Sequence, residues 1–309
     1  MQAAVAAGLV PFDVGSDMTG SIRIPASYCG VFGFKPTSNR VPGTGHIPPL
    51  PGTPRLERFM AVSGPLARSV QDLELLMRVL AGPDGRDIEV APLPWRDAAP
   101  RAPRSLRIAY LTAFPDVPTA RDVRATLDRV VDALAGEGAI VEERDPGFAV
   151  AALNEAWRTF MPVLMSAMTE LMGAALPAVP KDAHAASYVD ALRVLDRRDA
   201  LVVAADALLA DFDAFLSPAT IATAFPHRPP RTPIPVDDAQ VDSRFVDHYL
   251  YPWSFTGHPA VVLPAGLGSD GLPIGVQLVA RRYGDENLLA VASAVSDLIG
   301  GFRARPVHS

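Results

Sequence analysis

The sequence predicts an α/β fold with a mixed β-sheet. An apolar run over residues 107–111, an amphipathic stretch over 119–134 and a second apolar run over 139–143 follow one another, which is the order of a βαβ unit. Later, two apolar runs over 260–264 and 274–280 are joined by a Gly-containing turn, as in antiparallel strands, and a helical pattern follows. Parallel and antiparallel strand pairs are therefore both expected.

Further elements follow from apolar periodicity. Apolar residues recur every three to four positions over 66–80, Ser69 is placed to cap this helix, and Gly82 with Pro83 ends it. The Ala-rich stretch 148–210 is helical in pattern with breaks at Gly173 and 177–180. The sequence also predicts a short buried strand and a last helix, at 214–217 and 285–299.

Glycine and proline mark the segments expected to be irregular. Seven glycines fall within the first 45 residues, and this density predicts tight turns in which loops dominate over long elements. Two Pro-rich stretches, 42–54 and 226–235, are predicted to be extended surface loops.

Composition excludes several classes of protein. The chain of 309 residues is 49% hydrophobic and 20% charged, which is typical of a globular protein. Its net charge of −6, without a basic block, argues against nucleic-acid binding. No apolar run reaches the ~20 residues that cross a bilayer, and the first residues lack the basic flank of a signal peptide. The single Cys29 excludes an internal disulfide, so we expect a cytoplasmic protein that binds neither nucleic acid nor membrane.

The run from Gly15 to Arg23 contains a candidate for nucleophilic chemistry. Ser21 follows Gly20 on a predicted turn whose backbone N–H groups could hold an oxyanion. The G-x-S-x-G elbow of α/β-hydrolases is absent, and a phosphate-binding loop would need Lys where Ser21 stands. From these residues alone, a turn or N-cap serine is favoured over a nucleophile.

The longer run from Gly15 to Thr37 resembles the core of the amidase signature family. Further resemblances follow in order at residues 63–69 with Asp72-Leu73, 213–218, 255–260 and 271–278, so the match extends over almost the whole chain. The resemblance implies one amidase-signature domain over residues 1–309, with a mixed sheet covered by helices on both faces.

The resemblance also implies roles for individual residues. The family uses a Ser-cis-Ser-Lys triad, and its nucleophile is the serine of a Gly-Gly-Ser-Ile-Arg motif, which corresponds to Ser21. The backbone N–H groups of Met18, Thr19, Gly20 and Ser21 would form the oxyanion hole, although Thr19 stands where many members have glycine. Asp17 and Arg23 are expected to support this loop, and the alternative is a solvated ion pair.

The other two members of the triad have no match. In the family the bridging serine lies about two dozen residues before the nucleophile, and the base lysine lies earlier still. Only 20 residues precede Ser21, so we expect an N-terminally truncated chain with impaired activity. Lys35 and Lys181 do not match the catalytic lysine, and Lys35 is interpreted as structural.

The resemblance implies hydrolysis of a small-molecule carboxylic amide through an acyl-enzyme, without a metal or organic cofactor, and it is compatible with a homodimer. Two alternatives stay open. One is a catalytically silent truncated homologue that acts as a binding protein, or a gene-model fragment. The other is the amidase subunit of a tRNA-dependent amidotransferase, although Thr19 and the loop 43–49 look more like stand-alone amidases.

Other candidate residues carry weaker signals. Cys29 is more typical of a small buried apolar residue than of a nucleophile. Four aromatic residues are either the lining of an acyl pocket or part of the core: Tyr249, Tyr251, Trp253 and Phe255. Six histidines show no metal-binding spacing and are expected at the surface or in packing roles: His46, His184, His227, His248, His258 and His308.

Overall fold

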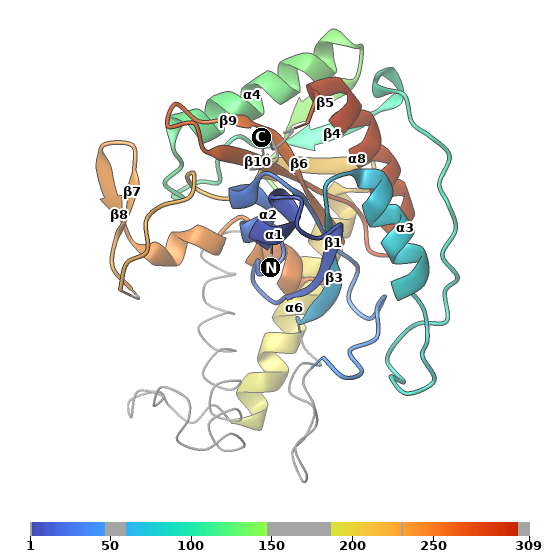
Figure 1. The fold of residues 1–309 in the computed structure, drawn as a ribbon. Coiled ribbons are helices and arrows are strands. Elements are labelled where there is room, and N and C mark those ends of the chain that lie inside the picture. Colours follow the sequence, from blue (N-terminus) through green and yellow to red (C-terminus); the bar gives the residue numbers. More distant parts are fainter. Residues whose placement is uncertain (1, 47–59, 147–186, 230, 302–309) are drawn as a thin grey trace.

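The computed structural model describes residues 2–46, 60–146, 187–229 and 231–301, and its centre is an eight-stranded sheet (Figure 1). The strands lie in the order β1-β3-β2-β9-β10-β6-β4-β5. Their bounds are β1 Phe12–Asp17, β2 Phe32–Lys35, β3 Val62–Ala67, β4 Arg107–Tyr110, β5 Ile140–Glu143, β6 Ala214–Pro218, β9 Ala260–Leu267 and β10 Pro273–Val279. Two short strands, β7 Ile234–Val236 and β8 Ala239–Val241, form a separate hairpin.

The sheet is mixed, as the sequence predicts. Strand β4 runs parallel to β5 and β6, and the other neighbouring pairs are antiparallel. The predicted βαβ unit is β4, helix α4 and β5. The described helices are α1 Gln2–Ala6, α2 Arg23–Cys29, α3 Val70–Leu80, α4 Arg121–Gly136, α6 Tyr188–Leu208, α7 Tyr251–Phe255 and α8 Asp285–Ile299, with 3-10 turns η2 Pro103–Ser105 and η4 Ser243–Asp247.

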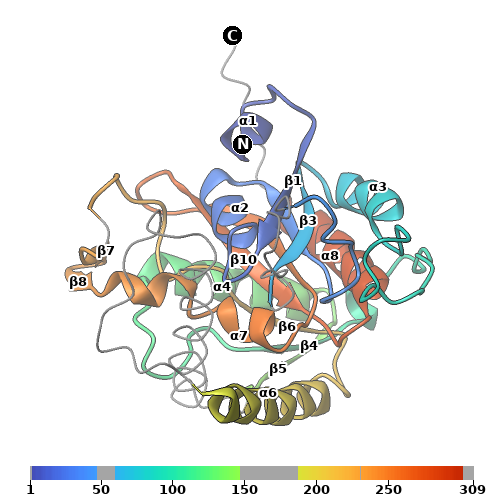
Figure 2. The same cartoon turned by 90° about the horizontal axis from the view of Figure 1, so that it is seen from below.

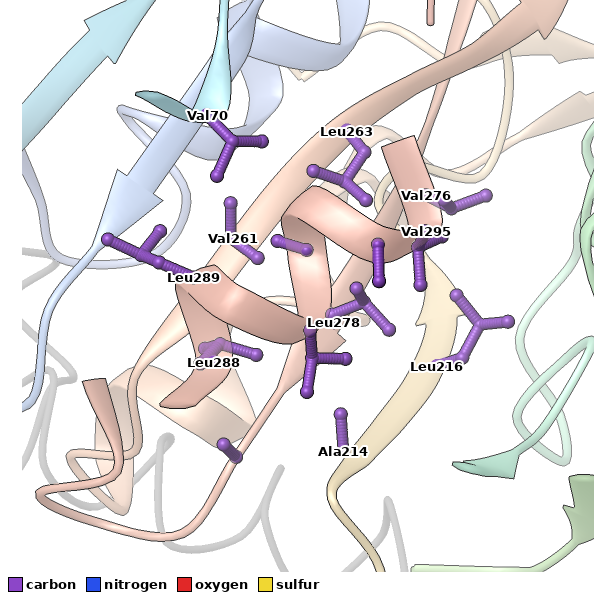
Figure 3. Close-up of a cluster of buried hydrophobic side chains, with 14 of the residues drawn as sticks. Val70, Ala214, Leu216, Val261, Leu263, Val276, Leu278, Leu288, Leu289 and Val295 are labelled. Atoms are coloured by element: carbon purple, nitrogen blue, oxygen red, sulfur yellow. The ribbon is translucent and has the colours of Figure 1, made fainter. Parts of the chain in front are cut away.

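Helices α3, α4 and α8 cover one face of the sheet, and α3 and α8 lie side by side (Figure 1). Buried aliphatic side chains of α8 meet those of β9 and β10 in the core of this face (Figure 3). Among them, Leu278 and Leu288 are fully buried. This apolar contact holds the layer together, because burying a Leu side chain contributes about 1.5–3 kcal/mol.

Helices α1, α2, α6 and α7 lie on the other face, and α6 runs along the edge of the molecule opposite α1 (Figure 2). Strand β6 shows how one element serves both layers, because Leu216 belongs to the core under α8 whereas Phe215 packs with Trp253 of α7. The predicted helices on both faces are therefore present. None of the helices in the described part combines the length and the apolarity needed to cross a membrane.

The described residues 2–45 contain short elements rather than long ones, as predicted: α1, β1, α2 and β2 have four to seven residues each and are joined by turns. Two of the glycines in this part of the sheet serve packing instead of turns. A Cβ added to Gly33 would lie 2.7 Å from Ala26 Cβ, and one added to Gly64 of β3 would lie 2.1 Å from the Phe34 carbonyl oxygen. Both glycines lie within strands, where they allow close approach of helix α2 and of strand β2 rather than forming turns.

Two predictions need adjustment. The apolar period places Leu66 in a helix, but the residue lies in β3, and the helix begins at Val70 because extended Ser69 accepts a hydrogen bond from the Asp72 N–H at 3.1 Å. Of the helical stretch predicted over 148–210, α6 accounts for its last part, and residues 148–186 lie outside the described residues.

Candidate active site

Ser21 lies on the turn that connects β1 to α2, and it is exposed. We call residues 17–23 the Ser21 turn. Gly20 has a φ of 135°, and a Cβ there would lie 2.6 Å from Leu250 Cδ1, so both the conformation and the space require glycine. The Gly20 carbonyl accepts a hydrogen bond from the Ile24 N–H at 2.7 Å, which joins the turn directly to helix α2.

An ion pair between Asp17 and Arg23 shapes the turn from inside. The Asp17 carboxylate accepts hydrogen bonds from Arg23 Nε and Nη2, both at 2.9 Å. It also accepts from the backbone N–H groups of Gly20 at 2.8 Å and of Ile22 and Arg23, each at 3.3 Å. Both side chains have no exposed surface, so the alternative of a solvated ion pair is wrong.

The Asp17 carboxylate stays ionised because Arg23 and the backbone N–H groups satisfy its charge. Burial raises the pKa of the Asp17 carboxyl, but the charge and hydrogen bonds of Arg23 outweigh burial, and the pKa lies below its usual range. An ionised carboxylate only accepts hydrogen bonds, so Asp17 can accept from the Arg23 side chain and from the Gly20 and Ile22 N–H groups at the same time. The backbone of the Ser21 turn is thereby fixed by a buried charge rather than by regular secondary structure.

The remaining donors of Arg23 connect the turn to distant segments. Arg23 Nη1 donates to Gln277 Oε1 at 2.7 Å on β10 and to the Leu250 carbonyl at 3.0 Å, and Nη2 donates to Ser254 Oγ at 2.6 Å on α7. Gln277 donates in turn to the Tyr249 carbonyl at 2.9 Å. Sequence reasoning missed Gln277 and Ser254 as site residues. For Gln277, the sequence signal was an amide side chain inside the otherwise apolar run of β10.

The predicted oxyanion-hole donors differ in their availability. The N–H of Gly20 is engaged by Asp17, whereas the N–H groups of Met18, Thr19 and Ser21 have no acceptor among the described residues. The Ser21 hydroxyl likewise has no hydrogen-bond partner within the described part of the chain. The turn thus presents a hydroxyl beside unengaged N–H groups, an arrangement that can bind an anionic oxygen.

Apolar side chains flank the turn. Met18 and Ile24 are partly buried and pack against the cluster that contains Leu250 and Trp253. The four aromatic residues whose role the sequence leaves open are all buried in this cluster at 0–2% exposure, which makes them core residues: Tyr249, Tyr251, Trp253 and Phe255. The Tyr249 hydroxyl meets Thr119 Oγ1 at 2.5 Å and accepts from the Phe114 N–H at 3.3 Å.

The weaker candidates do not join the site. Cys29 is partly buried at the end of α2, and burial raises the pKa of its thiol, which disfavours a thiolate nucleophile. Within residues 2–46, 60–146, 187–229 and 231–301, no group of three His, Cys, Asp or Glu side chains could hold a metal ion. His258 is buried and contacts Thr256 Oγ1 at 2.8 Å and Asp206 Oδ1 at 3.3 Å, a packing role. His184 and His308 lie outside the described residues.

Comparisons with known proteins agree on one family. The family model described as "Amidase" matches residues 2–183 and 173–289. An acylamidase of Rhodococcus erythropolis is 30% identical over 94% of this chain and 62% of its own length. A subunit of the glutamyl-tRNA(Gln) amidotransferase of Deinococcus radiodurans is 31% identical over 94% of this chain and 65% of its own.

Solved structures give the same result for the fold. The structure of a 6-aminohexanoate cyclic dimer hydrolase complexed with substrate superposes with a TM-score of 0.79 at 27% identity, covering 99% of this chain and 68% of that one. The chain spans less than two thirds of the length of either curated relative named above.

Proposed function

Because this chain belongs to the amidase family, we propose that it cleaves carboxylic amides with Ser21 as the nucleophile. One observation carries the proposal: the exposed Ser21 hydroxyl sits on a turn whose backbone is held from below by the buried Asp17–Arg23 pair. A nucleophilic side chain has to be accessible to substrate, and its backbone has to be held in place, because a small displacement of the reacting atom lowers the reaction rate.

The proposed reaction has two steps. The Ser21 Oγ attacks the amide carbonyl, and the N–H groups of Met18, Thr19 and Ser21 stabilise the developing oxyanion. Gly20 would add its own N–H only on exchanging its hydrogen bond to Asp17. The amine leaves with a proton, and water then cleaves the acyl-enzyme ester to release the acid and restore the Ser21 hydroxyl.

Full activity requires a proton acceptor for Ser21. In the family this is a second serine and a lysine that come earlier in the chain, and no lysine precedes Ser21 among the 309 residues. General-base partners of this kind contribute on the order of 10⁴ in rate, so we expect residues 1–309 alone to turn over slowly. The catalytically silent homologue remains the competing proposal.

A covalent probe tests the nucleophile separately from turnover. A fluorophosphonate should add to residues 1–309 once, in an incubation long enough for a serine without its family-type base, and peptide mass spectrometry should locate the adduct on Ser21. The Ser21→Ala variant should remain unlabelled, and the control Ser105→Ala, which changes an exposed serine of η2, should label like the original chain. An adduct on another residue would refute the assignment.

Turnover is measured with a chromogenic anilide, for residues 1–309 and for a chain to which a family-like segment is added before Met1. We expect a rise on the order of 10⁴ with the added segment. Equal, robust hydrolysis by both proteins would show that Ser21 finds its base within the 309 residues. No hydrolysis by the longer protein would favour the silent homologue.

The amidotransferase relative motivates a second candidate function, the amidase subunit of a tRNA-dependent amidotransferase. This function predicts glutamine hydrolysis that depends on partner subunits, whereas a stand-alone amidase hydrolyses anilides by itself. Comparing release of ammonia from glutamine with release of aniline, in each case with and without candidate partner subunits, separates the two.

A further inference from the structure

Lys35 is a fully buried lysine at the end of β2 that the proposed reaction does not use. Gly33 and Lys35 share one face of β2, because side chains alternate along a strand. A Cβ on Gly33 would lie 2.7 Å from Ala26 Cβ and 3.0 Å from Ile22 Cγ2, so this face carries α2 and the Ser21 turn. The Lys35 side chain therefore leaves the sheet on the side of the Ser21 turn.

The hydrogen bonding of Lys35 fits an uncharged amine better than an ammonium. Its Nζ donates to the Pro36 carbonyl at 3.1 Å, and this is the one acceptor that the described residues offer it. An ammonium has three donors, so two of them would be buried without a partner. Burying an ammonium without compensating partners is far more costly than burying an amine.

Four buried groups act electrostatically on Lys35 or are acted on by it: Asp17 on β1, Arg23 on α2, His258 between α7 and β9, and Asp285 at the start of α8. Both carboxylates already accept hydrogen bonds from other groups. Asp17 holds Arg23 and the Ser21 turn, and Asp285 accepts from Thr37 N at 2.8 Å and Thr37 Oγ1 at 2.6 Å. Burial, followed by the charge of Arg23, lowers the pKa of Lys35 to about 7, against the opposing effect of the two carboxylates.

We propose that Lys35 is a positioning residue that gates the Ser21 turn by its own charge. While the Lys35 amine is uncharged, the Asp17 carboxylate keeps its hydrogen bonds to Arg23 and to the backbone of the Ser21 turn. A proton taken up from solvent places a second cation in the same buried space, where it repels the Arg23 guanidinium and attracts the Asp17 carboxylate. Both effects weaken the hydrogen bonds from Gly20 and Ile22 to Asp17, so the turn loosens as the pH falls. Only the effect on reactivity rests on Ser21 being the nucleophile.

The first experiment titrates Lys35 directly. The chain contains two lysines, Lys35 and Lys181, so labelling with ¹³Cε-lysine gives two NMR signals, and Lys35→Met assigns them. The Lys35 signal should titrate with a midpoint about three pH units below that of an ordinary lysine. A midpoint above about 9 would overturn the proposal, because the charge would then be constant at working pH.

The second experiment follows the conformation of the Ser21 turn by NMR and does not depend on catalytic activity. Labelling threonine carbonyls with ¹³C and glycine amides with ¹⁵N selects the three Thr-Gly pairs, at Gly20, Gly45 and Gly257. The Gly20 amide reports its hydrogen bond to Asp17 and should shift with the same midpoint as Lys35, while Gly45, which has no neighbour close to its Cβ position, serves as a reference. A static Gly20 signal, or one that still moves in Lys35→Met, would refute the gate.

The third experiment measures fluorophosphonate labelling against pH. In the original chain the rate should fall about tenfold from pH 8 to about pH 6, as the uncharged fraction of Lys35 falls. Lys35→Met should lose this acid-side decrease, and the permanently charged Lys35→Arg should label slowly throughout. A merely structural lysine would change the amount of folded protein without altering the pH profile.

Two further outcomes are distinguishable. No labelling at any pH, by residues 1–309 or by the chain with a family-like segment before Met1, combined with a titrating Gly20 signal, would refute the proposed nucleophile and support the gate. If Lys35→Met does not fold, Lys35→Gln replaces it, and labelling by either variant that keeps the acid-side decrease of the original chain overturns the gate.

Discussion

At the scale of single residues, the Asp17–Arg23 pair connects the local turn to the rest of the fold. Asp17 collects the donors of the Ser21 turn, and Arg23 carries the connection to β10 and α7. Buried ion pairs contribute little net stability when compared with apolar replacements, yet removing one partner leaves an uncompensated charge. The pair is therefore better explained by positioning than by stability.

Replacing Arg23 with Met should lower the free energy of unfolding by about 3–5 kcal/mol, because Asp17 would remain charged and buried without its partner. Urea denaturation followed by circular dichroism measures this change. The matched control is Arg244→Met, which removes the exposed pair with Asp242 and should leave the midpoint nearly unchanged. A similar small change for both variants would show that solvent reaches Asp17.

The lowered pKa of Lys35 predicts in which direction the free energy of unfolding changes with pH. The unfolded chain keeps the lysine proton up to about pH 10, whereas the folded chain releases it near pH 7, so between these values the unfolded state binds more protons. The free energy of unfolding should consequently rise with pH over this window, by at most about 1.4 kcal/mol per pH unit. Urea titrations of the original chain and Lys35→Met at several pH values test it. A slope that survives in the variant would assign the effect to another group.

At the scale of elements, close backbone approach decides where β2 and β3 can pair. A Cβ on Gly64 would lie 2.1 Å from the Phe34 carbonyl oxygen and 2.7 Å from Pro36 Cδ. Gly64→Ala should therefore force the strands apart and lower the free energy of unfolding by about 3 kcal/mol. Gly136→Ala in α4 meets no atom within 4 Å, and we expect a gain of up to about 1 kcal/mol from the better helix former. Thermal melts of both variants should move in opposite directions.

Elements with a clear period were predictable, and the glycine-rich strands were not. Helix α8 shows its apolar stripe and β4 its apolar run within a short window of sequence. Strand β3 owes Gly64 to the close approach of β2, and β2 owes Gly33 to the close approach of α2, contacts that only the assembled sheet reveals. Local propensity favours turns for such segments, and tertiary packing overrides it.

The same distinction applies to the candidate site. Ser21, Asp17 and Arg23 lie within one short motif, so a resemblance over that motif could identify them together. Gln277 is 254 positions from Arg23 in sequence, and Ser254 is 231 positions away. Neither could be assigned to the site from spacing, because the folding of β10 and α7 against the turn creates the contact.

At the scale of the whole molecule, one sheet separates two apolar layers that share its strands. On β6, Leu216 faces the layer under α8, and the adjacent Phe215 faces the layer under α7. Neither layer can lose its packing without exposing the strands on which the other depends. This sharing supports the proposal that the chain is one domain.

A single domain predicts one unfolding transition. Leu278→Ala opens a cavity in the layer under α8 and should lower the free energy of unfolding by about 2–5 kcal/mol, whereas Leu75→Ala, at a side chain that is 57% exposed, should change it little. Far-ultraviolet circular dichroism reports all helices. Tryptophan fluorescence reports Trp253 of the opposite layer once Trp95, which packs against the layer under α8, and Trp157 are replaced by Phe. Both signals should shift together in Leu278→Ala, because the layers unfold as one unit. A fluorescence transition that stays in place while the dichroism moves would divide the chain into two independent units.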